Sequence, residues 1–145
     1  MKLKSAFAAA GVIAIGLSGC GSPTATEASL VPNMTVPAGG ITPVKDVVMT
    51  PREGDTIELT AAANSTFKFE QLEAVMWCRA SQHAKANKFA DWEPLKSEPL
   101  RAATPETPMI GRSLVRMVRV APPAAPGAKK PVKDWCKNAP KAALA

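Results

Sequence analysis

Thr56–Ala63 (TIELTAAA) and Phe67–Lys88 (FKFEQLEAVMWCRASQHAKANK) are the two neighbouring stretches that decide the fold. The first alternates with the period of a half-buried β-strand, and one of its faces carries Ile57, Leu59, Ala61 and Ala63. In the second, apolar residues recur at the spacing of one helix face: Phe69, Leu72, Val75, Met76 and Ala80. The opposite, solvated side carries Glu70, Glu73, Ser81 and Lys85. A strand followed by an amphipathic helix predicts an α+β domain.

The flanking segments add further strands to this prediction. Val44–Thr50 is rich in β-branched residues, and the turn residues 51–55 would join it to the first stretch as a hairpin. Phe89–Leu95 predicts a third strand that Pro94 confines to a sheet edge, 96–111 a loop, and Arg112–Ala121 a last strand. We therefore expect a small two-layer α+β domain at 44–121, with one helix packed on a mostly antiparallel sheet of three or four strands.

The N-terminus carries the pattern of an export signal. Lys2 and Lys4 precede an apolar run, Ala6–Leu17, that is too short to cross a bilayer, for which about 20 residues are needed. The run ends in Leu17-Ser18-Gly19-Cys20, which has the form of a lipobox: a branched apolar residue, two small residues and a cysteine that takes the lipid. We predict a signal peptide at 1–19 and a lipidated Cys20; the alternative is an ordinary signal peptide with a chance cysteine.

A lipid anchor at Cys20 has consequences for address and organisation. No Asp follows the cysteine, which by similarity to Gram-negative lipoproteins predicts the periplasmic side of the outer membrane. Residues 20–43 are rich in Pro, Gly, Ser and Thr and predict a flexible tether. Residues 122–145 are rich in Pro, Ala and Lys and predict a tail that docks at Trp135-Cys136.

The remaining cysteines are Cys78 and Cys136. Two thiols in an oxidising compartment usually pair, and a bridge between them would stabilise a small domain by about 3–4 kcal/mol in the chain-entropy model. A free thiol or a redox function is the alternative, although the chain has no C-x-x-C motif. Trp77 lies beside the polar side of the helix, and we expect the Trp135-Cys136 tail to pack there.

Composition argues against several functions. Without residues 1–19 the net charge is +4, with no dense basic cluster, so we expect no nucleic-acid partner. His83 is the only histidine, the carboxylates are scattered, and the glycines form no phosphate-binding pattern. We therefore expect no catalytic residues, no metal site and no cofactor.

Two groups of basic residues have both a functional and a structural interpretation. Arg79 and His83 share the apolar sector of the helix; they either bind an anion at a pocket or close the end of the core. The last predicted strand carries three spaced arginines, Arg112, Arg116 and Arg119. They either contact anionic envelope ligands, such as lipopolysaccharide or peptidoglycan, or protect a sheet edge.

The segment from Thr56 to Leu95 resembles small proteobacterial lipoproteins of the Caulobacter CC0125 type. The resemblance rests on Arg79-Ala80-Ser81-Gln82 in the helix, a break at Asn87 and an aromatic at Phe89. The family reads Arg-Ala-Ala-Glu and then Gly at the corresponding places, so Ser81, Gln82 and Asn87 depart from it. The resemblance implies a β-β-α-β order and an envelope address, and it implies no activity.

These observations together predict a non-enzymatic envelope lipoprotein that has a structural, assembly or sensing role through contacts with an envelope protein. The alternatives are a binding module for an anionic envelope ligand and a subunit of a secretion or transport machine.

Overall fold

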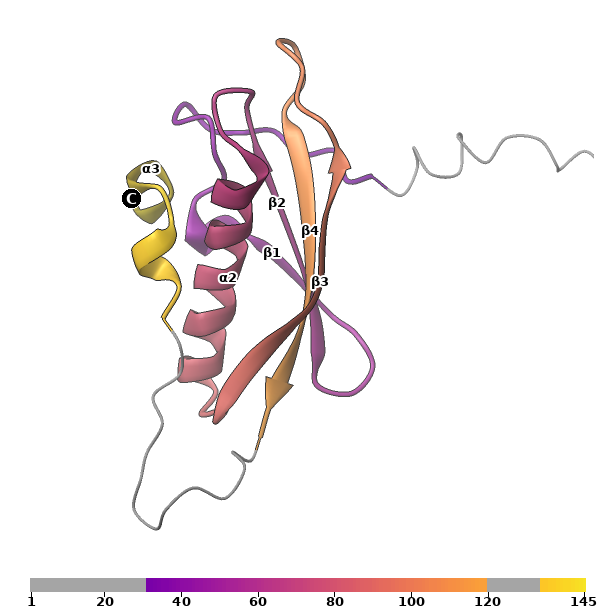
Figure 1. Cartoon of the computed structure of the whole chain (residues 1–145), viewed down its shortest axis with the longest axis vertical. Helices are drawn as coiled ribbons and strands as arrows, with labels where there is room; N and C mark the ends of the chain where they lie inside the picture. The colour runs from indigo at the N-terminus through magenta and orange to yellow at the C-terminus, as the bar shows by residue number, and fades with distance from the viewer. Residues whose placement is uncertain (1–30, 120–133) are drawn as a thin grey trace, which may run out of the picture. The chain divides into compact units, whose positions relative to one another are not determined.

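A computed structural model of the chain describes residues 31–119 and 134–145. The chain divides into two units after Pro32, and every element named below belongs to Asn33–Ala145. In chain order, the elements are the 3₁₀ helix η2 (Val44–Asp46), β1 (Val48–Pro51), β2 (Thr56–Ala63), α2 (Phe69–Ala86), β3 (Asp91–Arg101), β4 (Met109–Val118), the 3₁₀ helix η3 (Cys136–Asn138) and α3 (Lys141–Leu144) (Figure 1).

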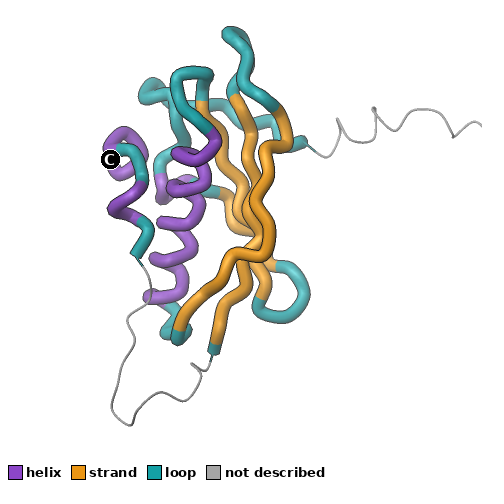
Figure 2. The backbone as a smooth tube through the Cα atoms, in the orientation of Figure 1, coloured by secondary structure: helices purple, strands orange, loops and turns teal. Residues whose placement is uncertain are grey.

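The four strands form one antiparallel sheet in the order β1-β2-β4-β3. α2 lies along one face of the sheet, and the C-terminal segment lies on the side of α2 away from the sheet (Figure 2). This arrangement confirms the predicted α+β domain of one main helix on an antiparallel sheet. The predicted signal peptide, including Cys20, lies outside the described residues.

The core lies between α2 and the sheet. Ile57 and Leu59 of β2 and Val115 of β4 are buried there with Leu72 and Met76 of α2. The close approach of α2 depends on a glycine: a Cβ at Gly111 would lie 2.9 Å from Leu72 Cδ2 and 3.0 Å from Phe69 Cε2. Leu72 therefore rests directly on the backbone of β4.

The predicted loop at 96–111 is wrong, because β3 continues to Arg101 and β4 already starts at Met109. Pro99, Pro105 and Pro108 predicted this loop, and Pro94 limited the strand predicted before it. Pro94 and Pro99 are tolerated because β3 is an edge strand whose register shifts just after each of them. The connecting loop is therefore confined to residues 102–108.

The folded domain begins before the predicted Val44. Ile41 is fully buried and forms an isolated bridge with Ala63, and the Thr42 side chain exchanges hydrogen bonds of 3.0 Å with the Ala62 backbone. Gly40 has a φ of +81°, and a Cβ there would overlap the Asn64 side chain. These residues extend the sheet alongside β2, and the predicted first strand splits into η2 and β1.

Candidate functional site

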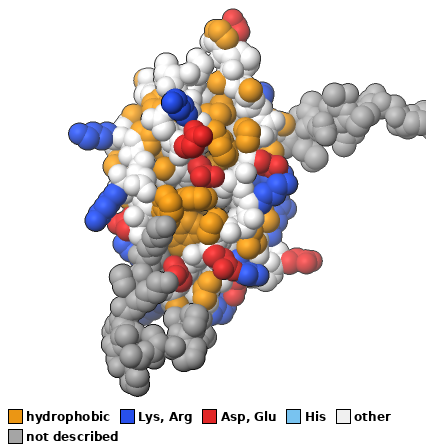
Figure 3. All heavy atoms as spheres, in the orientation of Figure 1, with side chains coloured by type: hydrophobic (Ala, Val, Ile, Leu, Met, Phe, Trp, Pro, Cys, Tyr) orange, Lys and Arg blue, Asp and Glu red, His pale blue; other side chains and the backbone are white. Residues whose placement is uncertain are grey.

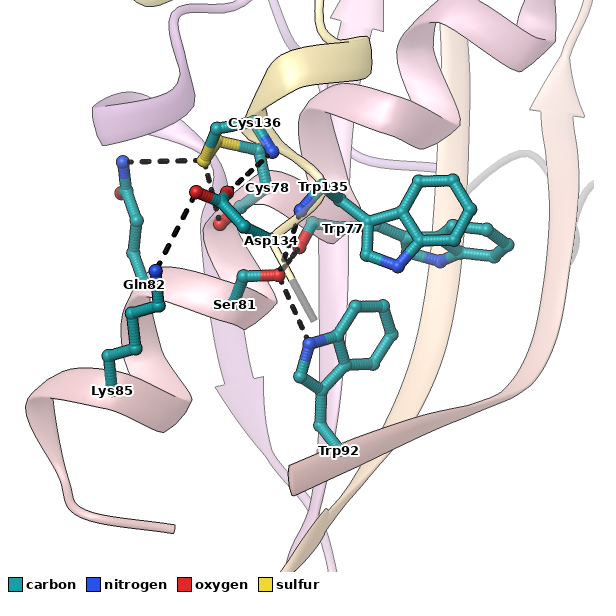
Figure 4. Close-up of polar contacts among 9 residues, drawn as sticks. All are labelled: Trp77, Cys78, Ser81, Gln82, Lys85, Trp92, Asp134, Trp135 and Cys136. Atoms are coloured by element: carbon teal, nitrogen blue, oxygen red, sulfur yellow. Dashed lines mark hydrogen bonds and ion pairs between the residues drawn. A yellow bond between two sulfur atoms is a disulfide. The ribbon is translucent and has the colours of Figure 1, made fainter. Parts of the chain in front are cut away.

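The main polar and aromatic cluster of the domain lies where the C-terminal segment meets α2 (Figure 4). We name it the tryptophan–disulfide cluster; its members are Trp77, Cys78, Ser81, Trp92, Trp135 and Cys136. The sulfur atoms of Cys78 and Cys136 are 2.01 Å apart, the distance of a disulfide bond, and the two residues are 58 positions apart in the sequence. The bond joins the middle of α2 to the first residue of η3.

Ser81 is the polar centre of this cluster. Its hydroxyl donates to the carbonyl of Trp77 at 3.0 Å and accepts from Trp92 Nε1 at 3.1 Å and from the Trp135 amide at 3.4 Å. Ser81 is only 1 % exposed, so its predicted place on the solvated side of α2 is wrong. Its polar side chain indicated solvent, but the C-terminal segment and β3 supply partners for it instead.

Trp77 links the C-terminal segment to the sheet. Its indole Nε1 donates to Ser113 Oγ on β4 at 2.9 Å, and Ser113 Oγ also lies 2.8 Å from Ser97 Oγ on β3. Its ring meets those of Trp135 and Trp92 in edge-on contacts, with centroids 4.7 and 5.9 Å apart. Edge-on geometry suits the electrostatics of aromatic rings, and the Trp77 N–H has the partner that a partly buried indole needs.

We name the described C-terminal residues, 134–145, the strap. The Asp134 carboxylate accepts from the Cys136 backbone N–H at 2.9 Å and lies 3.6 Å from Lys85 Nζ. The Cys136 hydrogen bond, and to a lesser degree Lys85, lower the pKa of Asp134. η3 and α3 follow, and Ala139 and Ala143 are buried, so docking onto the domain extends beyond the predicted Trp135-Cys136.

Arg112 and Arg116 occupy positions of β4 that lie between its buried positions and belong to the sheet face turned away from α2. Each is directly opposite a glutamate on β3 and forms an ion pair with it: Arg112 with Glu98 and Arg116 with Glu93. β4 is a central strand, so the structural alternative of edge protection is wrong for both. Oppositely charged cross-strand pairs instead stabilise this face modestly.

Arg119 follows β4 and binds Asp55 of the β1–β2 turn through two contacts of 2.7 Å. This hydrogen bonding lowers the pKa of Asp55 and raises that of Arg119. The guanidinium also lies 5.4 Å from the centroid of the Phe89 ring. All three predicted arginines thus have carboxylate partners. On the face of the molecule drawn in Figure 3, acidic and basic side chains lie near one another around an apolar area.

A shallow hollow of about 240 Å³ on this sheet face is lined by Glu58, Lys96, Glu98, Arg112 and Leu114. Hydrogen bonds from Arg112 and then Lys96 lower the pKa of Glu98, and Arg112 Nη1 lies 3.9 Å from Glu58. The two carboxylates offset the two cations, so the hollow does not concentrate positive charge.

Arg79 and His83 lie one helical turn apart on α2, and the side-chain amide of Asn87 lies 3.2 Å from His83 Nδ1. The Arg79 Nε atom is buried and has no hydrogen-bond partner among the described residues. The His83 ring stacks on Phe89 with centroids 6.0 Å apart, and burial, followed by the charge of Arg79, lowers its pKa. The geometry favours a place at the end of the core.

Within residues 31–119 and 134–145, no group of three His, Cys, Asp or Glu side chains is arranged to hold a metal ion. Among the described helices, none has both the length and the apolar character needed to cross a membrane. The predicted lipobox residues Leu17, Ser18, Gly19 and Cys20 lie outside the described residues. Comparisons of this chain with protein-family models, curated proteins and solved structures found no match.

Proposed function

We propose that this chain is a lipid-anchored protein of the bacterial envelope, attached through Cys20, that acts by contacts with another envelope protein rather than by catalysis. The observation that carries the proposal is Leu17-Ser18-Gly19-Cys20 after a basic and then an apolar segment. The pairing of Cys78 with Cys136 supports it, because disulfides persist in oxidising compartments such as the periplasm. We place the domain on the periplasmic side of the outer membrane and relate it to the lipoproteins of the Caulobacter CC0125 type.

The anchor is tested by expressing the full chain and its Cys20→Ala variant in a Gram-negative host. We expect the mature wild-type protein to begin at a triacylated Cys20, to enter the detergent phase and to sediment with outer membranes. The Cys20→Ala variant should do none of these, whereas Cys78→Ser should still be lipidated. A mature wild-type protein without lipid contradicts the proposal.

Protein contact is favoured over binding of an anionic ligand because each strand arginine already has a carboxylate partner. Such exposed pairs are worth about 0–1 kcal/mol, so a strongly anionic surface could still displace them. Retention of the Arg112→Gln, Arg116→Gln and Arg119→Gln triple variant on lipopolysaccharide and peptidoglycan separates the two functions. Retention equal to that of the wild type contradicts the anionic-ligand alternative. Loss of retention favours that alternative over protein contact.

The partner itself is sought by crosslinking in cells from a photoreactive residue at exposed Gln82, beside the tryptophan–disulfide cluster. A residue at exposed Glu106, in the distant β3–β4 loop, is the matched control. A discrete adduct from Gln82 alone supports a protein contact at this cluster. Adducts from neither position, or equally from both, count against it.

A further inference from the structure

The strap (residues 134–145) covers part of α2 that would otherwise face solvent. Cys78 and Ser81 are buried on the side of α2 that receives the strap, and Trp77 packs against Trp135 at its margin. These covered residues are small or polar apart from Trp77. The strap therefore covers a mixed surface of α2 and adds two small side chains, those of Ala139 and Ala143, to the margin of the core.

The described non-covalent contacts of the strap are modest. Its buried side chains include Ala139 and Ala143, which offer little apolar area. The Lys85–Asp134 pair is largely exposed, with half of the lysine side chain in solvent, and the Trp135–Ser81 hydrogen bond is long at 3.4 Å. The Cys78–Cys136 bond is the one covalent link between α2 and the strap.

The two sulfur atoms differ in accessibility. Cys78 is fully buried in the core cluster, whereas Cys136 is partly exposed at the start of η3. The Gln82 side-chain amide lies 3.9 Å from Cys136 Sγ, and Gln82 itself is exposed. An attacking thiolate from solvent therefore reaches Cys136 before it reaches Cys78.

We propose that the Cys78–Cys136 disulfide is a redox latch, and that its reduction by a dithiol releases the strap and uncovers the α2 surface around Trp77, Cys78 and Ser81 while the sheet stays folded. The proposal does not depend on the function proposed above, because it rests only on how the strap is attached. It gives the domain a closed, oxidised form and an open, reduced form.

The chemistry is a thiol–disulfide exchange in two steps. One thiolate of the dithiol forms a bond to Cys136 Sγ, the Cys78–Cys136 bond breaks, and its electron pair goes to Cys78 Sγ, which takes up a proton. The second thiol of the reductant then attacks the mixed disulfide and releases Cys136 as a thiol. The latch gains two electrons and two protons, and the dithiol becomes a disulfide.

The sheet should survive this reaction because the strap adds only the small side chains of Ala139 and Ala143 to the core cluster, whereas its large buried side chains come from the sheet and α2. Leu59, Val115 and Met117 of β2 and β4 pack with Leu72 and Met76 of α2. The hydrogen bonds from Trp77 to Ser113 and from Trp92 to Ser81 also join α2 to β4 and β3 independently of residues 134–145. Opening is therefore a local rather than a global transition.

The test is hydrogen exchange and limited trypsin digestion of the purified, detergent-solubilised full-length mature protein, before and after treatment with dithiothreitol. We expect exchange within 134–145 and cleavage after exposed Lys137 to rise by at least about tenfold on reduction, while β2 and β4 keep their protection. The tryptophan emission should shift to longer wavelength as Trp77 and Trp135 meet water.

The control is the Cys78→Ser, Cys136→Ser double variant, which should resemble the reduced wild type with or without dithiothreitol. Unchanged protection of the strap after reduction overturns the proposal, because the non-covalent contacts would then suffice to hold it. Loss of protection in β2 and β4 together with the strap also overturns it, because the disulfide would then hold the whole domain.

Discussion

α2 contacts the sheet on one side and the strap on the other, and different interactions hold the two contacts. On the side of the sheet, the large side chains of Leu72 and Met76 are fully buried against β2 and β4. On the side of the strap, α2 presents Cys78 and Ser81, which are held by a disulfide and a small set of hydrogen bonds. The contact with the sheet depends on the burial of large apolar side chains, whereas the contact with the strap combines a covalent bond with the Trp77–Trp135 ring contact and the burial of small side chains.

This difference indicates which contact can be regulated. Apolar burial does not depend on the redox state of the surroundings, whereas a disulfide opens when a sufficiently strong dithiol is present. Leu72→Ala acts on the sheet side of α2 and loss of the disulfide on the strap side, whereas Ser113→Ala acts on the link between them.

The largest effect is expected from Leu72→Ala, on the sheet side. Leu72 is fully buried against the backbone at Gly111, so its loss leaves a cavity and should lower the free energy of unfolding by about 3–5 kcal/mol. Urea denaturation of the oxidised proteins measures this. The control is Leu95→Ala, at a position 44 % exposed, which should change stability by less than about 0.5 kcal/mol. Similar losses in both variants would show that this side does not rest on burial.

The Cys78→Ser, Cys136→Ser double variant should come next, on the strap side. Without the link across 58 positions, the free energy of unfolding should fall by about 2–4 kcal/mol, since the unfolded chain is no longer constrained. Cys20→Ala, which leaves both of these cysteines in place, should be as stable as the wild type in the same urea titration. No loss of stability in the double variant would mean that the bond does not contribute to the fold.

Ser113→Ala probes the link between Trp77 and the sheet. The change removes the acceptor of the Trp77 indole N–H from a fully buried site, and it should cost about 1–2 kcal/mol. Ser65→Ala, at an exposed turn position, is the matched control and should be neutral. If the effect of Ser113→Ala differs between the oxidised and the reduced protein, the two sides of α2 are coupled through Trp77.

The smallest effect concerns pH. Burial lowers the pKa of His83 in the folded domain below its ordinary value of 6.5, so the unfolded chain binds a proton more readily. The stability that neutral His83 contributes is therefore present above pH 6.5 and is lost as the pH falls through the unfolded and then the folded pKa. Thermal unfolding of His83→Gln should be less sensitive to pH in this window than that of the wild type. If the unfolding temperature changes equally with pH in both proteins, burial does not lower the pKa of His83 in the folded domain.

Periodicity predicted much of the fold. The alternation in β2 and the helical spacing of Leu72 and Met76 are local consequences of burial on one face, so they can be read without knowing the partner segments. The disulfide could be predicted from the number of cysteines, because the predicted lipid at Cys20 left only Cys78 and Cys136 to pair.

The features that sequence missed are non-local. Ser81 looks solvated because its burial depends on Trp135, which lies 54 positions away. The strand character of 96–101 is hidden by Pro99, whose tolerance depends on the place of β3 at the edge. The carboxylate partners of Arg112 and Arg116 follow from the strand register, which the sequence pattern alone did not supply.

A bond between Cys78 and Cys136 closes the strap side of α2. Non-reducing peptide mapping of the full-length protein, purified from a bacterial envelope with free thiols alkylated at lysis, tests it directly. We predict one disulfide-linked pair of peptides that contain Cys78 and Cys136 and carry no alkyl group. Recovery of both cysteines as alkylated free thiols in the folded protein would contradict the account.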